Sequence, residues 1–364
     1  MIDKILFYKK MARNLFPMYR LKIIKVLPFI FLLFVNTQSC KSPTGPEALQ
    51  PGRRDYTWTI DTVNSDPYKT LYRIWGSSSS DVWVIGNGDD DSKDIFHFDG
   101  HNWIGGGKYW TLYEPNSLYG FGPNDVYFGC ASGRIYHFDG NNMKEVAALS
   151  EDGHNDIIFD NMWGNSNNDL YAFGAYPDSQ GLYNGSVIAK LSNNNWIELN
   201  TEGLTGIVGQ LCTDGTDQKL YMQVLKISNG YDTAFIYELY QGTFSQLYKT
   251  LWGNSWANVS LINNEIYFTL DKKIARRVNE QFQTILDLNN TNFDLNIWGR
   301  NSEDIFLEMT DGLAHYNGTD IKYLFHYNQS NVEIFGAALF QDDVFFLVYE
   351  HTTGLSLVYH GKLK

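Results

Sequence analysis

Beyond residue 55 the chain alternates short apolar runs with clusters of small and polar residues. Runs such as Val82-Trp83-Val84-Ile85 are rich in β-branched and aromatic residues, which favour strands. Gly, Asn, Asp and Ser separate the runs, as expected for turns. A helical period of 3.6 residues is absent from this part of the chain. The pattern therefore predicts an all-β protein.

A group of three or four strands recurs seven times. Its second strand begins at residues 81, 125, 169, 219, 265, 304 and 343, which gives spacings of 44, 44, 50, 46, 39 and 39 residues. Periods of about 40 to 50 residues with four short strands are typical of propeller blades. The fourth and fifth units keep the strand pattern but lose the signature residues, so their boundaries stay open. We expect a seven-bladed β-propeller of four-stranded blades over residues 55–364.

The two ends of the body predict how the ring closes. The last unit ends after its third strand, at Gly361. A spare strand, Tyr56-Thr57-Trp58-Thr59-Ile60-Asp61, precedes the first unit and is similar to the fourth strand at Asn195-Trp196-Ile197. We expect this N-terminal strand to complete the seventh blade, which leaves no long unpaired edge.

The repeat resembles bacterial propeller repeats that read roughly W-G-x-S-x-x-D-V-W/Y-x-V/F-G, followed by h-x-H-F/Y-D/N-G-x-x-W. In the first unit the resemblance is carried by Trp75-Gly76-Ser77, Asp81-Val82-Trp83 and His97-Phe98-Asp99-Gly100. These repeats are common in exported bacterial proteins. The resemblance implies a scaffold used for binding, and it supplies no catalytic residues.

The N-terminus has the layout of a secretory signal. Basic residues precede an apolar run of ten residues, Val26 to Val35. This run is shorter than the roughly 20 residues of a membrane-spanning helix. Ser39-Cys40 resembles the lipobox of bacterial lipoproteins, from which Thr37-Gln38 departs. We expect residues 1–39 to be a lipoprotein signal peptide, Cys40 to be acylated and residues 40–54 to form a tether to the cell envelope, in the outer membrane. A cleaved signal peptide with an incidental cysteine is the alternative.

The charge of the exported body excludes some partners. Without residues 1–40 the chain keeps 21 of its 28 basic residues and 40 of its 41 acidic residues. Nucleic acids and anionic lipid surfaces need a basic footprint, so we expect neither as a ligand. The body should be monomeric and touch the membrane only through its lipid anchor. Cys130 and Cys212 lie in different units, and we expect two buried free thiols, with a disulfide as the alternative.

Several recurring residues have a structural explanation. His97, His137 and His315 share one position in the third strand, where the other units have Lys190, Leu239, Arg277 and Val358. Equivalent residues of different blades lie too far apart to share one metal ion, so we expect hydrogen bonds within each blade. The aspartates that open the second strand are expected to bond the backbone of the turn. They are Asp81, Asp125, Asp169, Asp304 and Asp343.

The Trp-Gly pairs repeat as regularly as the blades. Their tryptophans are Trp75, Trp163, Trp252 and Trp298. Such regular recurrence indicates that each tryptophan packs between neighbouring blades and that the glycine allows close backbone approach.

Segments that the repeat does not require are the candidates for ligand contact. The loops between second and third strands share one face of a propeller with the links between blades. This face gathers aromatic rings and carboxylates, which suit a sugar or a protein partner. The candidate ligand-binding residues are Tyr109, Trp110, Tyr176, Tyr183, Tyr231 and Trp256. Asp89, Asp90, Asp91 and Asp94 could bind Ca²⁺, with a solvated acidic turn as the alternative.

The sequence contains no Gly-x-Ser-x-Gly, His-Glu-x-x-His, P-loop or dinucleotide motif, so no catalytic residue is assigned. We expect a cell-envelope binding or scaffold protein for a glycan or protein partner, which needs no cofactor besides the possible Ca²⁺. The alternative is an exported polysaccharide hydrolase or lyase that uses carboxylates of the loop face.

Overall fold

The computed structural model describes residues 52–64, 69–87, 94–105, 112, 114–151, 153–215, 218–228, 232–251, 256–289 and 291–364. All the described residues belong to one compact unit, Leu49–Lys364. In this part of the chain every element is a strand, and no helix that could span a membrane is found there.

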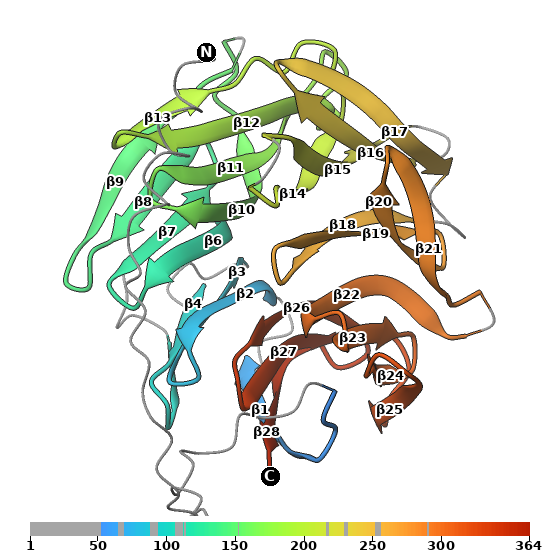
Figure 1. Ribbon diagram of the computed structural model, residues 1–364. Helices are drawn as coiled ribbons and strands as arrows, with labels where there is room; N and C mark the ends of the chain where they lie inside the picture. The colour runs from blue at the N-terminus through green and yellow to red at the C-terminus, as the bar shows by residue number, and fades with distance from the viewer. Residues whose placement is uncertain are drawn as a thin grey trace, which may run out of the picture. The chain divides into compact units, whose positions relative to one another are not determined.

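Seven four-stranded antiparallel sheets surround a common axis (Figure 1). Blade 1 contains β2 (Thr70–Ser78), β3 (Asp81–Asn87), β4 (Ile95–Phe98) and β5 (Trp103–Gly105). Blade 2 contains β6 (Pro115–Gly122), β7 (Asp125–Cys130), β8 (Arg134–Phe138) and β9 (Met143–Ala148). Blade 3 contains β10 (Ile158–Ser166), β11 (Asp169–Tyr176), β12 (Gly185–Ser192) and β13 (Asn195–Glu198).

The two units with a weak signature are complete blades. Blade 4 contains β14 (Ile207–Cys212), β15 (Leu220–Lys226), β16 (Thr233–Tyr240) and β17 (Thr243–Leu251). Blade 5 contains β18 (Ala257–Ile262), β19 (Glu265–Leu270), β20 (Lys273–Val278) and β21 (Gln281–Asp287). Blade 6 contains β22 (Phe293–Asn301), β23 (Asp304–Met309), β24 (Gly312–Tyr316) and β25 (Ile321–His326).

Blade 7 confirms the predicted closure. It joins β26 (Val332–Leu339), β27 (Asp343–Glu350) and β28 (Leu355–Leu363) to β1 (Tyr56–Asn64), in the order β1-β28-β27-β26. Tyr56 pairs with Leu363 at one end of β1, and Asn64 pairs with Ser356 at the other. The innermost strands β2 and β26 also contact each other, so the ring is continuous. The prediction of a seven-bladed propeller is confirmed.

The core lies between blades because the second strand of a blade is buried on both faces. Successive side chains of a strand point to opposite faces. Val82 and Val84 therefore pack against blade 7, while Trp83 and Ile85 pack against blade 2. This arrangement explains why these strands read as continuous apolar runs rather than as an alternation of apolar and polar residues.

The Trp-Gly pairs join neighbouring blades, as predicted. The Trp75 ring of blade 1 lies 6.3 Å from the Tyr119 ring of blade 2, measured between centroids. A Cβ added at Gly120 would lie 2.7 Å from the Trp75 ring, so only glycine fits there. Trp298 of blade 6 packs edge-on against Phe346 of blade 7. Trp252 lies outside the described residues.

The histidines bond within their own blades, as predicted, and they do so through the aspartates that open the second strands. The Nε2 atom of His97 lies 2.6 Å from Asp81, and that of His315 lies 2.7 Å from Asp304. Asp81 also accepts hydrogen bonds from the side chains of Ser77 and Trp83. These aspartates therefore bind side chains of the blade, whereas the sequence predicted bonds to the turn backbone.

Every blade has one such pair at equivalent positions. The seven pairs are Asp81–His97, Asp125–His137, Asp169–Lys190, Lys219–Glu238, Glu265–Arg276, Asp304–His315 and Asp343–His360. The assignment of Leu239, Arg277 and Val358 to the histidine position was wrong, since Glu238, Arg276 and His360 occupy it. In blade 4 the two charges are exchanged between the strands. Cys130 and Cys212 are buried free thiols, as predicted.

Candidate functional site

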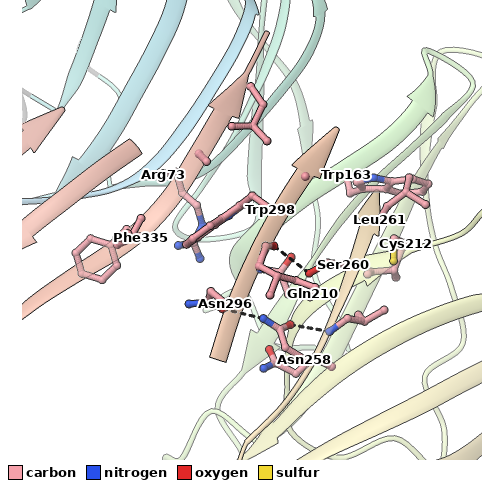
Figure 2. A pocket seen from close by; sticks show the side chains of 18 of the residues that line it. Arg73, Trp163, Gln210, Cys212, Asn258, Ser260, Leu261, Asn296, Trp298 and Phe335 are labelled. Carbon is pink, nitrogen blue, oxygen red and sulfur yellow. Dashed lines mark hydrogen bonds between the residues drawn. The ribbon is translucent and has the colours of Figure 1, made fainter. Parts of the chain in front are cut away.

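The seven innermost strands surround a cavity of about 620 Å³. Residues of β2, β6, β10, β14, β18, β22 and β26 all line it. We call this cavity the channel. Its wall combines aromatic rings, including Trp163, Trp298 and Phe335, with polar side chains such as Arg73 and Asn296 (Figure 2). A wall of this kind can enclose an apolar group while it orients a polar one.

The innermost strands are irregular where they begin. The pairing register shifts near the start of β2, β6, β10, β14, β22 and β26. Such bulges redirect side chains and occur often beside functional sites. In β22 the shift contains Leu295, whose φ of 81° is unusual for a residue other than glycine. We call this end of the channel, where the strands begin, the mouth.

Arg73 of β2 is held by backbone carbonyl groups. Its Nε and Nη2 atoms donate to the carbonyl oxygen of Asp160 at 3.0 and 2.7 Å. Its Nη1 atom donates to the carbonyl oxygen of Tyr72 at 2.9 Å. Burial lowers the pKa of Arg73, although the charge of Asp160 opposes this effect. The contacts fix the guanidinium in the channel without neutralising it.

Asp160 brings a negative charge to the same end of the channel. Burial raises the pKa of its carboxyl to about 6, and the charge of Arg73 offsets this only in part. A carboxylate in this position is destabilised because it has left water without gaining an equal partner.

A chain of side-chain hydrogen bonds crosses from blade 5 to blade 7. Asn258 donates to Asn296 at 2.9 Å (Figure 2), and Asn296 donates to Glu308 at 2.7 Å. The other oxygen of Glu308 accepts the backbone N–H of Ile334 at 2.8 Å. Burial raises the pKa of Glu308 well above its ordinary value. Each of its oxygens accepts a hydrogen bond, so Glu308 joins blade 6 to blade 7 at the mouth.

A smaller cavity of about 260 Å³ adjoins the mouth. It shares Trp256, Asn296 and Glu333 with the channel. Asp294 and Glu308 also line it. Burial raises the pKa of Asp294. The mouth therefore combines the Trp256 ring with several carboxyl groups.

The structure places three of the predicted ligand-binding residues. Trp256 lines both cavities. Tyr176, at the end of β11, stacks on His154 with ring centroids 5.0 Å apart. The pKa of Tyr183 is raised by burial and then by the charges of Asp156, Glu114 and Asp160. Tyr109, Trp110 and Tyr231 lie outside the described residues.

The predicted calcium ligands and the lipidation site fall mostly outside the described residues. Cys40, Asp89, Asp90 and Asp91 all lie there. Asp94 is buried and pairs with the buried ammonium group of Lys69. Among the described residues, no group of three or more His, Cys, Asp or Glu side chains could hold a metal ion. Asp94 therefore contributes to the packing of blade 1.

The sequence analysis did not select Arg73, Asn258 or Asn296. One signal could have found two of them, because Arg73 and Asn296 each lie two residues before the tryptophan of a Trp-Gly pair. The repeat shows that this tryptophan lies on the innermost strand. A polar residue two positions before it, near the start of the same strand, can therefore be expected to line the channel.

No family model matches the chain, and no curated protein matches it in sequence. Solved structures are similar in fold alone. The structure of YCF48 bound to D1 peptide has a TM-score of 0.56 at 14% identity and covers 88% of this chain and 99% of its own. The extracellular domain of BT4673 from B. thetaiotaomicron has a TM-score of 0.55 at 11% identity, covering 82% of this chain and 39% of its own. The Cps50 (Swd1) β-propeller domain of Myceliophteria thermophila has a TM-score of 0.51 at 8% identity and covers 84% of this chain and 100% of its own.

Proposed function

We propose that this protein is an exported, lipid-anchored binding module that holds a segment of a protein partner at the mouth of its central channel. The observation that carries the proposal is the channel itself, where aromatic rings surround a fixed guanidinium and a chain of amide groups. Aromatic residues and arginine are the side chains that dominate protein recognition.

Two comparisons support this proposal. The similar structure of YCF48 was obtained bound to a peptide. The similar domain of BT4673 is extracellular. The signal layout and Cys40 support export and an anchor in the outer membrane. A glycan partner is the competing hypothesis, because the same rings could stack on sugars. The alternative of an exported polysaccharide hydrolase or lyase is a hypothesis from the sequence alone.

Binding can be tested with the full-length chain in detergent on two arrays. One array carries overlapping peptides from exported proteins of the source bacterium, and the other carries envelope glycans. We expect retention on the peptide array that falls about tenfold or more in Trp256→Ala, since large aromatic residues in a binding pocket often act as hot spots. Ile60→Ala is the control, because this exposed side chain lies on the outer strand β1. Retention on glycans alone, or peptide retention that Trp256→Ala leaves unchanged, would contradict the proposal.

The anchor can be tested in cells by labelling with an alkyne-bearing fatty acid. The wild-type chain should incorporate the label and sediment with membranes, whereas Cys40→Ala should lose the label and stay unprocessed. Cys130→Ala is the control, since this thiol is buried in blade 2. Equal labelling of wild type and Cys40→Ala would show that Cys40 is not the acylated residue.

A further inference from the structure

We propose that Arg73 receives a carboxylate of the bound segment and that the acids of the mouth restrict the ligand to one such group. This inference rests on the proposed function, because it names the chemical group that enters the same channel.

The first argument is the contrast between Arg73 and the other arginines. Among the described residues, every other arginine forms an ion pair with a carboxylate. These are Arg53, Arg54, Arg134, Arg276, Arg277 and Arg300. In the same part of the chain, Arg73 bonds only to carbonyl oxygens. Removing a charge from water is costly unless a partner compensates it. A ligand carboxylate would supply the missing partner.

The second argument is geometric. A guanidinium has five N–H groups in a rigid fork, and its bonds to Asp160 and Tyr72 use three of them. The two remaining N–H groups are one each on Nη1 and Nη2, and a carboxylate can accept from two such atoms at once. The carbonyl contacts hold the fork in place before a ligand arrives, so little entropy is lost on binding.

The third argument concerns the surroundings of the fork. Trp298 and Phe335 line the same cavity as Arg73 (Figure 2). Rings that exclude water strengthen a charge-assisted hydrogen bond. They also favour a ligand that carries an apolar group next to its carboxylate.

The acidic residues of the mouth limit how many negative charges a ligand can carry. Asp160 lies close enough to Arg73 for each charge to affect the pKa of the other. Asp294 and Glu333 line the adjoining cavity. A second anionic group on the ligand would meet these carboxylates and be repelled. The channel should therefore accept a single carboxylate and reject polyanions.

Matched small probes test the carboxylate without any knowledge of the partner. N-acetylphenylalanine and its uncharged amide have the same shape and represent a chain terminus. N-acetylglutamic acid α-amide and N-acetylglutamine α-amide represent a side chain. In calorimetry with the full-length chain, we expect the acid of at least one pair to bind about tenfold more tightly than its amide. The pair that shows the difference identifies which kind of carboxylate is bound.

Variants test whether the difference in affinity between acid and amide depends on Arg73. Arg73→Gln should abolish the preference for the acid, and Arg73→Lys should retain part of it because the charge stays while the fork is lost. Asp160→Asn should strengthen binding of the acid and leave the amide unchanged. Arg134→Gln is the control, since Arg134 is half exposed and pairs with Glu145 on blade 2.

The inference is overturned if the acid and amide of both pairs bind equally to the wild-type chain, if neither acid binds at millimolar concentration, or if Arg73→Gln keeps the preference. The wild-type comparison holds even where Arg73→Gln fails to fold. Peptide retention that depends on Trp256 without any preference for a carboxylate would leave the proposed function standing and remove this inference alone.

Discussion

Asp160 and Arg73 show how a bulge places charges in a channel without pairing them side chain to side chain. Arg73 binds the backbone oxygen of Asp160, and the two charges act on each other from a greater distance. The stability of the fold should therefore depend on the ionisation of Asp160. The pKa of its carboxyl is about 6 in the folded chain, above the ordinary value of 3.8.

This raised pKa fixes the sign of a pH effect. The folded state binds the proton more tightly than the unfolded state, so the ionised carboxylate destabilises the fold above about pH 6, and this cost disappears as the pH falls toward 4. Asp160→Asn should raise the melting temperature by about 2 to 4 °C at pH 7.5 and change it little at pH 4. Differential scanning fluorimetry of both proteins at the two pH values measures this. Asp156→Asn, at an exposed position nearby, should change neither value. A melting temperature of Asp160→Asn that matches wild type at both pH values would show that this carboxyl is well solvated.

At the scale of elements, the length of the hairpin between the third and fourth strands explains why the histidine position was located correctly in blade 1 and one residue off in blade 4. In blade 1, Phe98 pairs with Trp103, so four residues form the turn. In blade 4, Tyr240 pairs with Thr243, and only two residues form it. Counting back from the turn glycine therefore identified His97 correctly and missed Glu238 by one position. A shift of one residue moves a side chain to the opposite face of the sheet.

β1 is the element on which ring closure depends. Its Trp58 ring contacts Phe325 of blade 6 at 4.8 Å between centroids and Phe346 of blade 7 at 6.3 Å. Trp58→Ala should lower the free energy of unfolding by roughly 2 to 4 kcal/mol, because it removes a partly buried ring that joins two blades. Ile60→Ala on the same strand should cost less than about 0.5 kcal/mol, since Ile60 is 54% exposed. Urea unfolding measures both values. Equal costs would mean that β1 contributes through its backbone alone.

At the scale of the whole molecule, the fold could be predicted and the channel chemistry could not. Seven repeats, a short last unit and a spare first strand predict a closed ring, because a propeller blade buries its faces only against its neighbours. Trp256 was selected as an unusual aromatic residue in a link, and it lines both cavities. Arg73 was missed because it lies at the bulge of β2, which the strand pattern of the repeat does not mark. Its carbonyl partner Asp160 belongs to blade 3, so the contact exists only once blades 1 to 3 have packed together.

The strand that closes the ring is also the first strand of the body. The backbone N–H of Lys364 donates to the backbone oxygen of Asp55 at 3.2 Å, so Lys364 is held beside the start of β1. A mechanical load on the N-terminal side of residue 52 would therefore act on the pairing of β1 with β28 before it reached any other blade. Pulled along its axis, β1 must break many of its bonds to β28 together. If β1 were instead pulled away from its Tyr56 end, its hydrogen bonds to β28 would break one after another. The ring would then open at blade 7.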